Sequence, residues 1–184
     1  MMKISRKILT VFLISFVLIS GVSLSKVAAQ TNSITNQQIE RIRGNCVSTK
    51  TTLNQLHASD ALLRVNIGQI YESMSIKLMK GFNSRVSNNK LNNTKLTTVT
   101  NSFNSTLDIF RSDYKTYEEH LSQAINIDCE KQPVSFYDAV TVTRKDRAKV
   151  HSDIMNLNQY IKQYQLAINE LKKDYQTLTS KKGL

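Results

Sequence analysis

Residues 150–178 read VHSDIMNLNQYIKQYQLAINELKKDYQTL, and their apolar side chains recur at steps of three and four positions. This spacing places them on one face of a helix that packs against other helices. Upstream, residues 136–143 (FYDAVTVT) are rich in β-favouring residue types, but the sequence offers them no partner strand. Pro133, the only proline, suits the first turn of a helix, so we predict one helix over about 133–180. Its apolar seam comprises Val150, Ile154, Leu157, Ile161, Tyr164, Ile168, Leu171, Tyr175 and Leu178.

Two earlier stretches carry the same pattern. The first seam comprises Ile39, Ile42, Cys46, Thr49, Leu53, Leu56, Asp60, Leu63, Ile67, Ile70, Met74 and Lys77. The second comprises Leu96, Val99, Phe103, Leu107, Phe110, Tyr114, Tyr117, Leu121 and Ala124. Between them, residues 86–93 (VSNNKLNN) hold side chains that compete with helical hydrogen bonds, which indicates a turn. We therefore predict helices over about 34–85 and 94–127.

The composition favours an all-α fold. The 184 residues include five glycines, one proline and no tryptophan, which is too little turn chemistry for a β-sandwich or a β-barrel. Because no single helix can bury its apolar seam alone, the three predicted helices must pack together. The sequence predicts an elongated, antiparallel up-down-up bundle of three coiled-coil-like helices over residues 30–184.

The first 29 residues have the features of a secretory signal peptide. Basic residues precede a charge-free, mostly apolar run at 8–24, and small residues at 27–29 suit a signal peptidase. This run is at the lower limit for a permanent membrane helix, so its retention as an anchor is the alternative. Cleavage after Ala29 removes four cationic residues and no acid, which lowers the formal net charge from +11 to +7. We expect an exported bacterial protein of the periplasm, cell surface or extracellular space.

Cys46 and Cys129 are the only two cysteines, and in an exported protein such a pair indicates a disulfide bond. The predicted hairpin gives a check that assumes no bond. If the first two helices fold about residues 87–90, the numbers of residues at the same level add up to about 177, and those of the cysteines add up to 175. A redox-active pair is disfavoured because the close Cys-x-x-Cys spacing is missing.

The same register predicts a polar layer inside the bundle. Asp60 lies level with Tyr117, and Arg144 and Arg147 of the third helix fall near the same height. A carboxylate, a phenol and guanidinium groups form a coherent hydrogen-bonded set. Two interpretations remain: a device that fixes helix register, and a pocket for an anion or a small ligand. His57 and His120 would flank this layer, so a metal site with Asp60 is a further alternative to ordinary surface histidines.

Catalytic motifs are missing from the sequence. It contains no Gly-rich phosphate loop, no Gly-x-Ser-x-Gly, no His-Glu-x-x-His and no close Cys/His cluster. Carboxylates such as Asp113, Glu118 and Glu119 are predicted on a solvated helix face. We expect a protein that is not an enzyme and that needs no cofactor or catalytic metal.

One end of the predicted bundle is basic. The end of the first helix, the first turn and the C-terminus meet there, and together they bring Lys77, Lys80, Arg85, Lys90, Lys95, Lys172, Lys173, Lys181 and Lys182. In the two ranges that hold these cations, residues 77–95 and 170–184, the only acidic residues are Glu170 and Asp174. Such a tip can bind an anionic surface, although cations at helix C-termini also complement the helix dipoles.

These features predict an envelope or surface interaction module, or a scaffold, with a basic tip for anionic partners. Candidate partners are envelope polymer, lipid headgroups or another protein. Sequence-specific nucleic-acid binding is disfavoured because the tip has few aromatic residues for base stacking. A periplasmic holdase chaperone is one alternative, and a small-ligand or metal binder at the polar layer is another. The oligomeric state stays open.

Overall fold

The computed structural model describes residues 34–181, and the predicted signal peptide lies outside the described residues. Every regular element in this range is a helix, so the prediction of an all-helical fold is confirmed. The elements are α2 (Asn36–Gly44), α3 (Cys46–Ser73), the π-helix η1 (Met74–Lys80), α4 (Gly81–Asn88), α5 (Thr94–Asn126) and α6 (Pro133–Lys181). None of these helices combines the length and apolar content that a membrane crossing requires.

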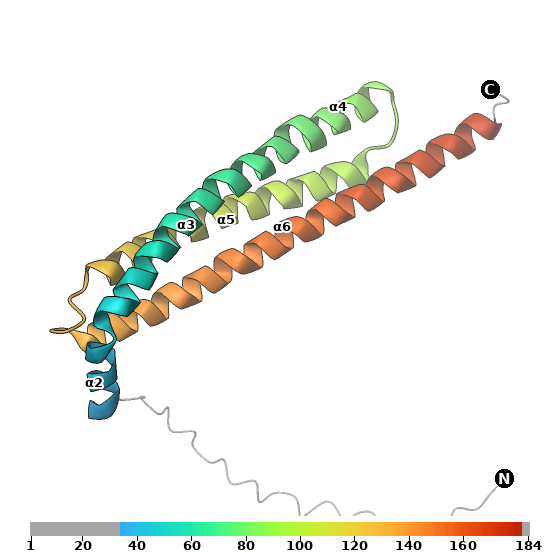
Figure 1. Cartoon of the computed structure of the whole chain (residues 1–184). Coiled ribbons are helices and arrows are strands. Elements are labelled where there is room, and N and C mark those ends of the chain that lie inside the picture. The colour runs from blue at the N-terminus through green and yellow to red at the C-terminus, as the bar shows by residue number, and fades with distance from the viewer. Residues whose placement is uncertain (1–33, 182–184) are drawn as a thin grey trace, which may run out of the picture. The chain divides into compact units, whose positions relative to one another are not determined.

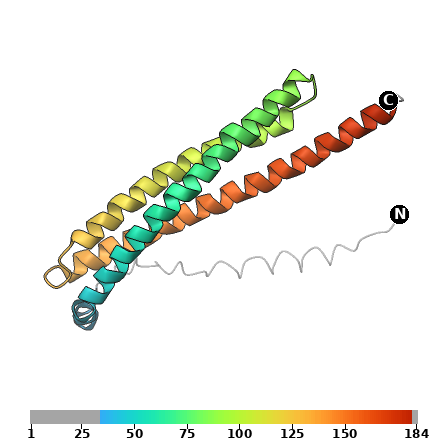
Figure 2. The same cartoon turned by 45° about the horizontal axis from the view of Figure 1, so that its top comes forward.

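The predicted continuous helix over 34–85 is wrong, because this segment contains a break and a π-helix. Asn45 (φ −103°, ψ 8°) separates α2 from α3, and α2 leaves the direction of α3 (Figures 1 and 2). Gly44 and Asn45 are both weak helix formers, which explains the position of the break. The backbone amide and the side chain of Asn45 both donate hydrogen bonds to the Arg41 carbonyl at the end of α2. The bounds of α5 and α6 differ from the predicted ones by one residue.

α5 is the central element of the helical bundle. It packs against α3 and, most extensively, against α6, and both views show it running beside these two helices. Its predicted seam is buried except at Val99, which is half-buried beside the buried Thr100, and Phe103, Leu121 and Ala124 are fully covered. Tyr71 of α3 reaches this seam and packs edge-on against Phe103 and Phe110. The apolar core is therefore organised around one face of α5.

α3 and α6 approach each other through long polar side chains. Arg43 hydrogen-bonds the carbonyl of Glu130, just before α6 begins. Asp60 is bound by Arg147, and Tyr71 by Asn158. In all three pairs the partners are 87 residues apart in sequence. The constant offset shows that α3 and α6 run parallel and in register.

The predicted seam of the first helix is only partly buried. Leu63 and Ile70 are each 53% exposed, and Lys77 is exposed as well. The buried positions beyond this point are Tyr71, Ser75, Met79 and Asn83, which follow at steps of four. In a π-helix the backbone hydrogen bonds join residues i and i+5, and each turn holds more residues than a turn of α-helix. The residues of η1 that face the core are therefore not those that the spacing of three and four predicts.

The turn after α4 is a Schellman motif, a hydrogen-bonded C-terminal cap. The Leu91 amide donates to the Val86 carbonyl (3.1 Å) and the Lys90 amide to the Ser87 carbonyl (2.8 Å). Lys90 adopts φ 57°, the left-handed conformation that glycine normally supplies in this motif. A side chain in this conformation costs about 1–2 kcal/mol. The chain therefore places a lysine at the apex of the turn where glycine would favour folding.

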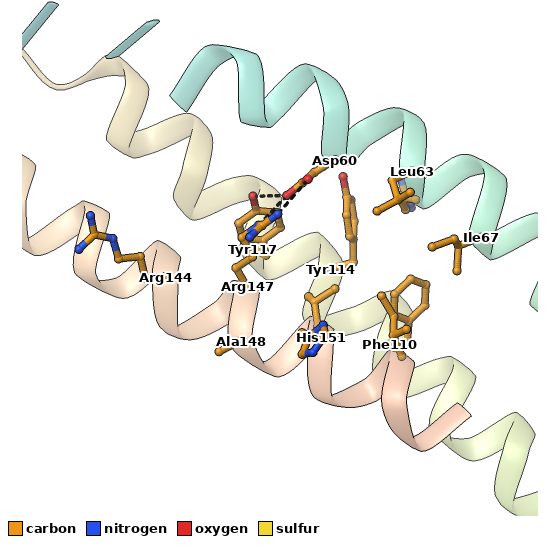
Figure 3. Close-up of a pocket in the computed structure, with 13 residues that line it drawn as sticks. Asp60, Leu63, Ile67, Phe110, Tyr114, Tyr117, Arg144, Arg147, Ala148 and His151 are labelled. Carbon is orange, nitrogen blue, oxygen red and sulfur yellow. Dashed lines mark hydrogen bonds and ion pairs between the residues drawn. The ribbon is translucent and has the colours of Figure 1, made fainter. Parts of the chain in front are cut away.

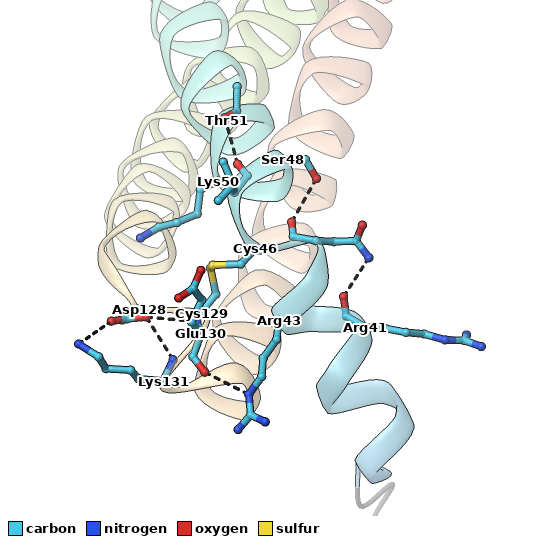
Figure 4. The surroundings of a disulfide bond; sticks show 12 residues. Arg41, Arg43, Cys46, Ser48, Lys50, Thr51, Asp128, Cys129, Glu130 and Lys131 are labelled. Carbon is cyan, nitrogen blue, oxygen red and sulfur yellow. Dashed lines mark hydrogen bonds and ion pairs between the residues drawn. A yellow bond between two sulfur atoms is a disulfide. The ribbon is translucent and has the colours of Figure 1, made fainter.

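The predicted disulfide joins Cys46 and Cys129, with Cα atoms 5.6 Å apart (Figure 4). Both cysteines are buried, so the bond ties the start of α3 to the loop before α6. Asp128 caps this loop by accepting hydrogen bonds from the amides of Glu130 and Lys131. Backbone and side-chain hydrogen bonds from Lys131 lower the pKa of Asp128, and they outweigh its slight desolvation, which acts to raise that pKa.

Replacing both cysteines, Cys46→Ser with Cys129→Ser, should lower the free energy of unfolding by about 2–4 kcal/mol, because the bond closes a long loop in the unfolded chain. Urea denaturation followed by circular dichroism measures the loss. Wild-type protein treated with a reductant should shift by the same amount. An unchanged unfolding midpoint in the double variant would show that the bond adds no stability.

Candidate functional site

Asp60 is the centre of a hydrogen-bonded set between the three long helices (Figure 3). Tyr117 Oη donates to Asp60 Oδ2 over 2.7 Å. Arg147 donates from Nε to Oδ2 (2.9 Å) and from Nη2 to Oδ1 (3.3 Å), a bidentate pair. The Asp60 side chain is 14% exposed, whereas that of Arg147 is 52% exposed. The structure thus brings together three of the four residues of the predicted polar layer.

Opposing effects act on the ionisation of this set. Burial by itself would raise the pKa of Asp60, but the hydrogen bonds from Arg147 and Tyr117 and the charge of Arg147 lower it below its ordinary value. Burial, and then the hydrogen bond and charge of Asp60, raise the pKa of Tyr117. Asp60 is therefore a carboxylate and Tyr117 a neutral donor across the neutral pH range.

Arg144 lies outside this hydrogen-bonded set. The sequence predicts Arg144 near the height of the polar layer, but the buried face of α6 passes through Val140 and Thr143. Thr143 donates its hydroxyl to the Ala139 carbonyl and needs no partner across the bundle. Arg144 is exposed, and no acidic side chain of the described residues lies within 4.0 Å of it.

Asp60→Asn should lower the free energy of unfolding at pH 7 by about 1–3 kcal/mol, because Arg147 loses its charged partner. The Asp60 carboxylate has a lowered folded pKa, so its stabilisation is complete above the unfolded value and disappears as the pH falls through the folded value. The difference between variant and wild type should therefore shrink in acid. Denaturation curves at pH 7 and pH 3 measure it.

Asp138→Asn is the matched control, since Asp138 is an exposed acid of α6 without an ion pair among the described residues. Its free energy of unfolding should stay near that of wild type. A loss for Asp60→Asn that is the same at both pH values would contradict the assigned role of the carboxylate.

The two histidines near the polar layer have separate partners. His57 Nε2 lies 4.0 Å from Glu118 Oε1, and His120 Nδ1 lies 2.6 Å from the buried Asp146. Neither pairs with Asp60, which is bound by Tyr117 and Arg147. Within residues 34–181, no three His, Cys, Asp or Glu side chains are grouped closely enough to hold a metal ion. The predicted grouping of His57, His120 and Asp60 is therefore not formed.

Two further tyrosine bridges cross from α6 to the first helical segments. Tyr71 Oη donates to Asn158 Oδ1 over 3.3 Å. Tyr164 Oη lies 2.7 Å from Asn83 Oδ1 and 3.1 Å from the Met79 carbonyl. Sequence reasoning placed Tyr164 in an apolar seam and left Tyr71 outside every seam. The offset of 87 residues, already present in Asp60 and Arg147, could have indicated Asn158 for Tyr71, but not the partners of Tyr164, which lie 85 and 81 residues away.

A carboxyl pair between α5 and α6 was also missed. Asp153 is 8% exposed, and its Oδ2 is buried without a hydrogen-bond partner. Burial is the main cause that raises the pKa of Asp153, and the charge of Asp113 and a hydrogen bond with Asp113 raise it further. The charge of Lys149 lowers this pKa, but by less. Asp113, predicted on the solvated face, is instead half-buried. The sequence pattern could have indicated that Asp153 is buried, because it lies three residues after Val150 and four before Leu157, on the apolar face of the helix.

Asp153→Asn should raise the free energy of unfolding at pH 7 by about 1 kcal/mol, because it removes a buried charge and gives Asp113 a hydrogen-bond donor. The folded pKa of Asp153 is raised, so wild type loses stability as the pH rises through that value. The gain of the variant should therefore be larger at pH 7 than at pH 4. Chemical denaturation at both values tests this, and a variant less stable than wild type at pH 7 would contradict it.

A cavity of about 400 Å³ opens beside the polar layer, between α3, α5 and α6. Asp60, Tyr117 and Arg147 line one end of it, as Figure 3 shows, and Arg144 also lines the cavity, with its side chain directed away from these three. The other end is apolar and is lined by Leu63, Ile67 and Phe110, as Figure 3 shows, and Ile154 also lines the cavity. The Arg64 guanidinium lies 4.9 Å from the centre of the Tyr114 ring, within cation–π range. The cavity is therefore polar and cationic at one end and apolar at the other.

The predicted basic tip lies at one end of the bundle. In both cartoons the end of α4, the following turn and the end of α6 lie at the same extremity. Lys95 pairs with Glu170, which links α5 to α6 there. The other described cations of the tip are exposed, and no acidic side chain of the described residues lies within 4.0 Å of them: Lys77, Lys80, Arg85, Lys90, Lys172 and Lys173.

These cations surround the end of the bundle rather than forming one flat patch. Lys77 lies beside Ile70 and Leu78 on one side of the first helical segments. Lys80 lies on another side, near Glu72 and Asn104. The side chain of Lys181 and the whole of Lys182 lie outside the described residues.

Comparison with protein-family models, curated proteins and solved structures finds no match to the chain. The geometry of the basic end and of the cavity therefore carries the functional argument.

Proposed function

We propose that this chain is an exported, non-enzymatic protein that binds an anionic envelope surface through its basic end. In this proposal residues 1–29 direct export. The remaining residues form an elongated, antiparallel, coiled-coil-like bundle of three long helical segments. Acidic lipid headgroups and anionic wall polymer are the partners that fit this chemistry, because both present many phosphates or carboxylates. The buried disulfide supports export, since such bonds persist in oxidising compartments.

The conformation of Lys90 is the observation that carries the proposal. Its φ of 57° places a charged side chain at the apex of a turn where glycine would be favoured. Residues held in costly backbone conformations are frequent at functional sites. Five other exposed cations without an acidic partner within 4.0 Å belong to the same basic end. A lysine that reduces stability and adds positive charge at this position fits selection for binding an anionic partner.

Lys90→Gly separates stability from binding. The variant should raise the free energy of unfolding by about 1 kcal/mol, because glycine adopts the left-handed conformation without strain. Its affinity for phosphatidylglycerol vesicles should fall, because a phosphate-binding cation is lost. Thermal unfolding and vesicle co-sedimentation measure the two effects on the same preparation. A variant that is more stable and binds as well as wild type would remove Lys90 from the site.

A matched pair of multiple variants tests the whole basic end. One variant changes Lys80, Lys90, Lys172 and Lys173 to Gln, and the control changes Lys50, Lys115, Lys131 and Lys145 to Gln, so both lose four charges. Binding to phosphatidylglycerol vesicles should weaken by about tenfold or more in the first variant and much less in the control, with salt reducing all binding. Phosphatidylcholine vesicles should bind neither protein. Equal losses in both variants would show that net charge alone matters.

A further inference from the structure

We propose that the cavity between α3, α5 and α6 binds the acyl chain of an anionic amphiphile, whose charged group contacts Arg144 and Arg147. This binding is separate from the proposed role of the basic end. It assigns a ligand class to a cavity whose two ends differ in chemistry (Figure 3).

The cavity exists because α6 does not close over the apolar stripe of α3. Leu63 is more than half exposed, and Ile67 is only partly buried. α5 packs closely against both helices, but α3 and α6 meet mainly through long polar side chains. These bridges hold the two helices apart, which leaves apolar side chains from both exposed to the gap. Its volume of about 400 Å³ lies within the range of about 300–1,000 Å³ that is typical of small-molecule sites.

The apolar end of the cavity suits a hydrocarbon chain. Leu63, Ile67 and Phe110 line it, and Ile154 also lines the cavity, so its apolar residues come from all three helices. Covering such side chains with an acyl chain removes apolar surface of both partners from water, which is worth about 25 cal/mol per Å². No charged residue lines this end except Arg64, whose guanidinium is held over the ring of Tyr114.

The polar end requires an anion. Arg147 uses Nε and Nη2 to neutralise Asp60 and is still half exposed. Arg144 also lines the cavity, and no acidic side chain of the described residues lies within 4.0 Å of it. The local charge of Asp60, Arg144 and Arg147 is therefore positive. A carboxylate or phosphate at the end of an acyl chain complements this charge, whereas a cationic or uncharged head does not.

Calorimetric titration of the full chain compares four twelve-carbon probes below their micelle concentrations. Dodecanoate and dodecyl phosphate carry an anion, dodecan-1-ol is neutral, and dodecyltrimethylammonium is cationic. At least one anionic probe should bind at one per chain, with a negative heat-capacity change, and about tenfold more tightly than the alcohol. The tighter of the two anions identifies a carboxylate or a phosphate ligand. Equal affinity for the alcohol, or tighter binding of the cation, would overturn the proposal.

Three variants locate the binding. Arg144→Gln should reduce the affinity for the anionic probe to that for the alcohol, while Lys145→Gln, the exposed neighbour outside the cavity, should leave it unchanged. Ala148→Trp places a bulky ring at an exposed cavity residue and should abolish binding of every probe without disturbing the core. Circular dichroism confirms that each variant is folded. Full binding by Ala148→Trp would place the ligand elsewhere and contradict the proposal.

Two further outcomes separate this site from other functions. The variant with four Gln substitutions at the basic end should bind the anionic probe as wild type does, so the failure of one proposal leaves the other standing. A chain that binds none of the probes but prevents aggregation of a reduced, unfolded protein would have a client-binding groove instead. That result would overturn the amphiphile proposal.

Discussion

The buried seam of α5 is the constraint on which the rest of the structure depends. Its aromatic and aliphatic side chains, from Leu96 to Ala124, receive the apolar faces of both α3 and α6. Because α5 occupies the centre, the other two helices need not bury their seams against each other. They are free to approach through hydrogen bonds, and the polar layer and the cavity lie where they do so.

The polar bridges between α3 and α6 are a consequence of that freedom. A carboxylate, two tyrosines and an asparagine reach across the gap at a nearly constant sequence offset, from Asp60 to Tyr164. The Arg43 contact has the offset of 87 at one end, and the disulfide beside it joins residues 83 apart. Burial of these groups is tolerated because each finds a partner, and a slip of α6 by one turn would leave several unpaired at once. The bridges therefore fix one register of α6 against α3, whereas apolar seams alone would allow several registers.

Two features reduce folding stability rather than add to it. Lys90 occupies a left-handed position, and Asp153 brings a second carboxyl group beside Asp113 in a buried place. Natural chains violate local rules of this kind mainly at functional or strained sites. For Lys90, the proposed binding of an anionic partner at the basic end supplies a functional reason. The raised pKa of Asp153 marks the cost of the Asp113–Asp153 pair, which is a local weakness between α5 and α6.

The sequence alone determined the helical class, the bounds of α5 and α6, the buried face of α5 and the pairing of the cysteines. These follow from apolar periodicity and from a hairpin whose register can be counted from its turn. It also brought Asp60, Tyr117 and Arg147 together, because the interruption of a seam marks a polar layer. Only the tertiary structure decided the break at Asn45, the rotation of the buried face at η1, the exclusion of Arg144 and the open gap between α3 and α6. Each of these depends on how far a helix turns or tilts against its neighbours, and a pattern read along one chain does not contain that quantity.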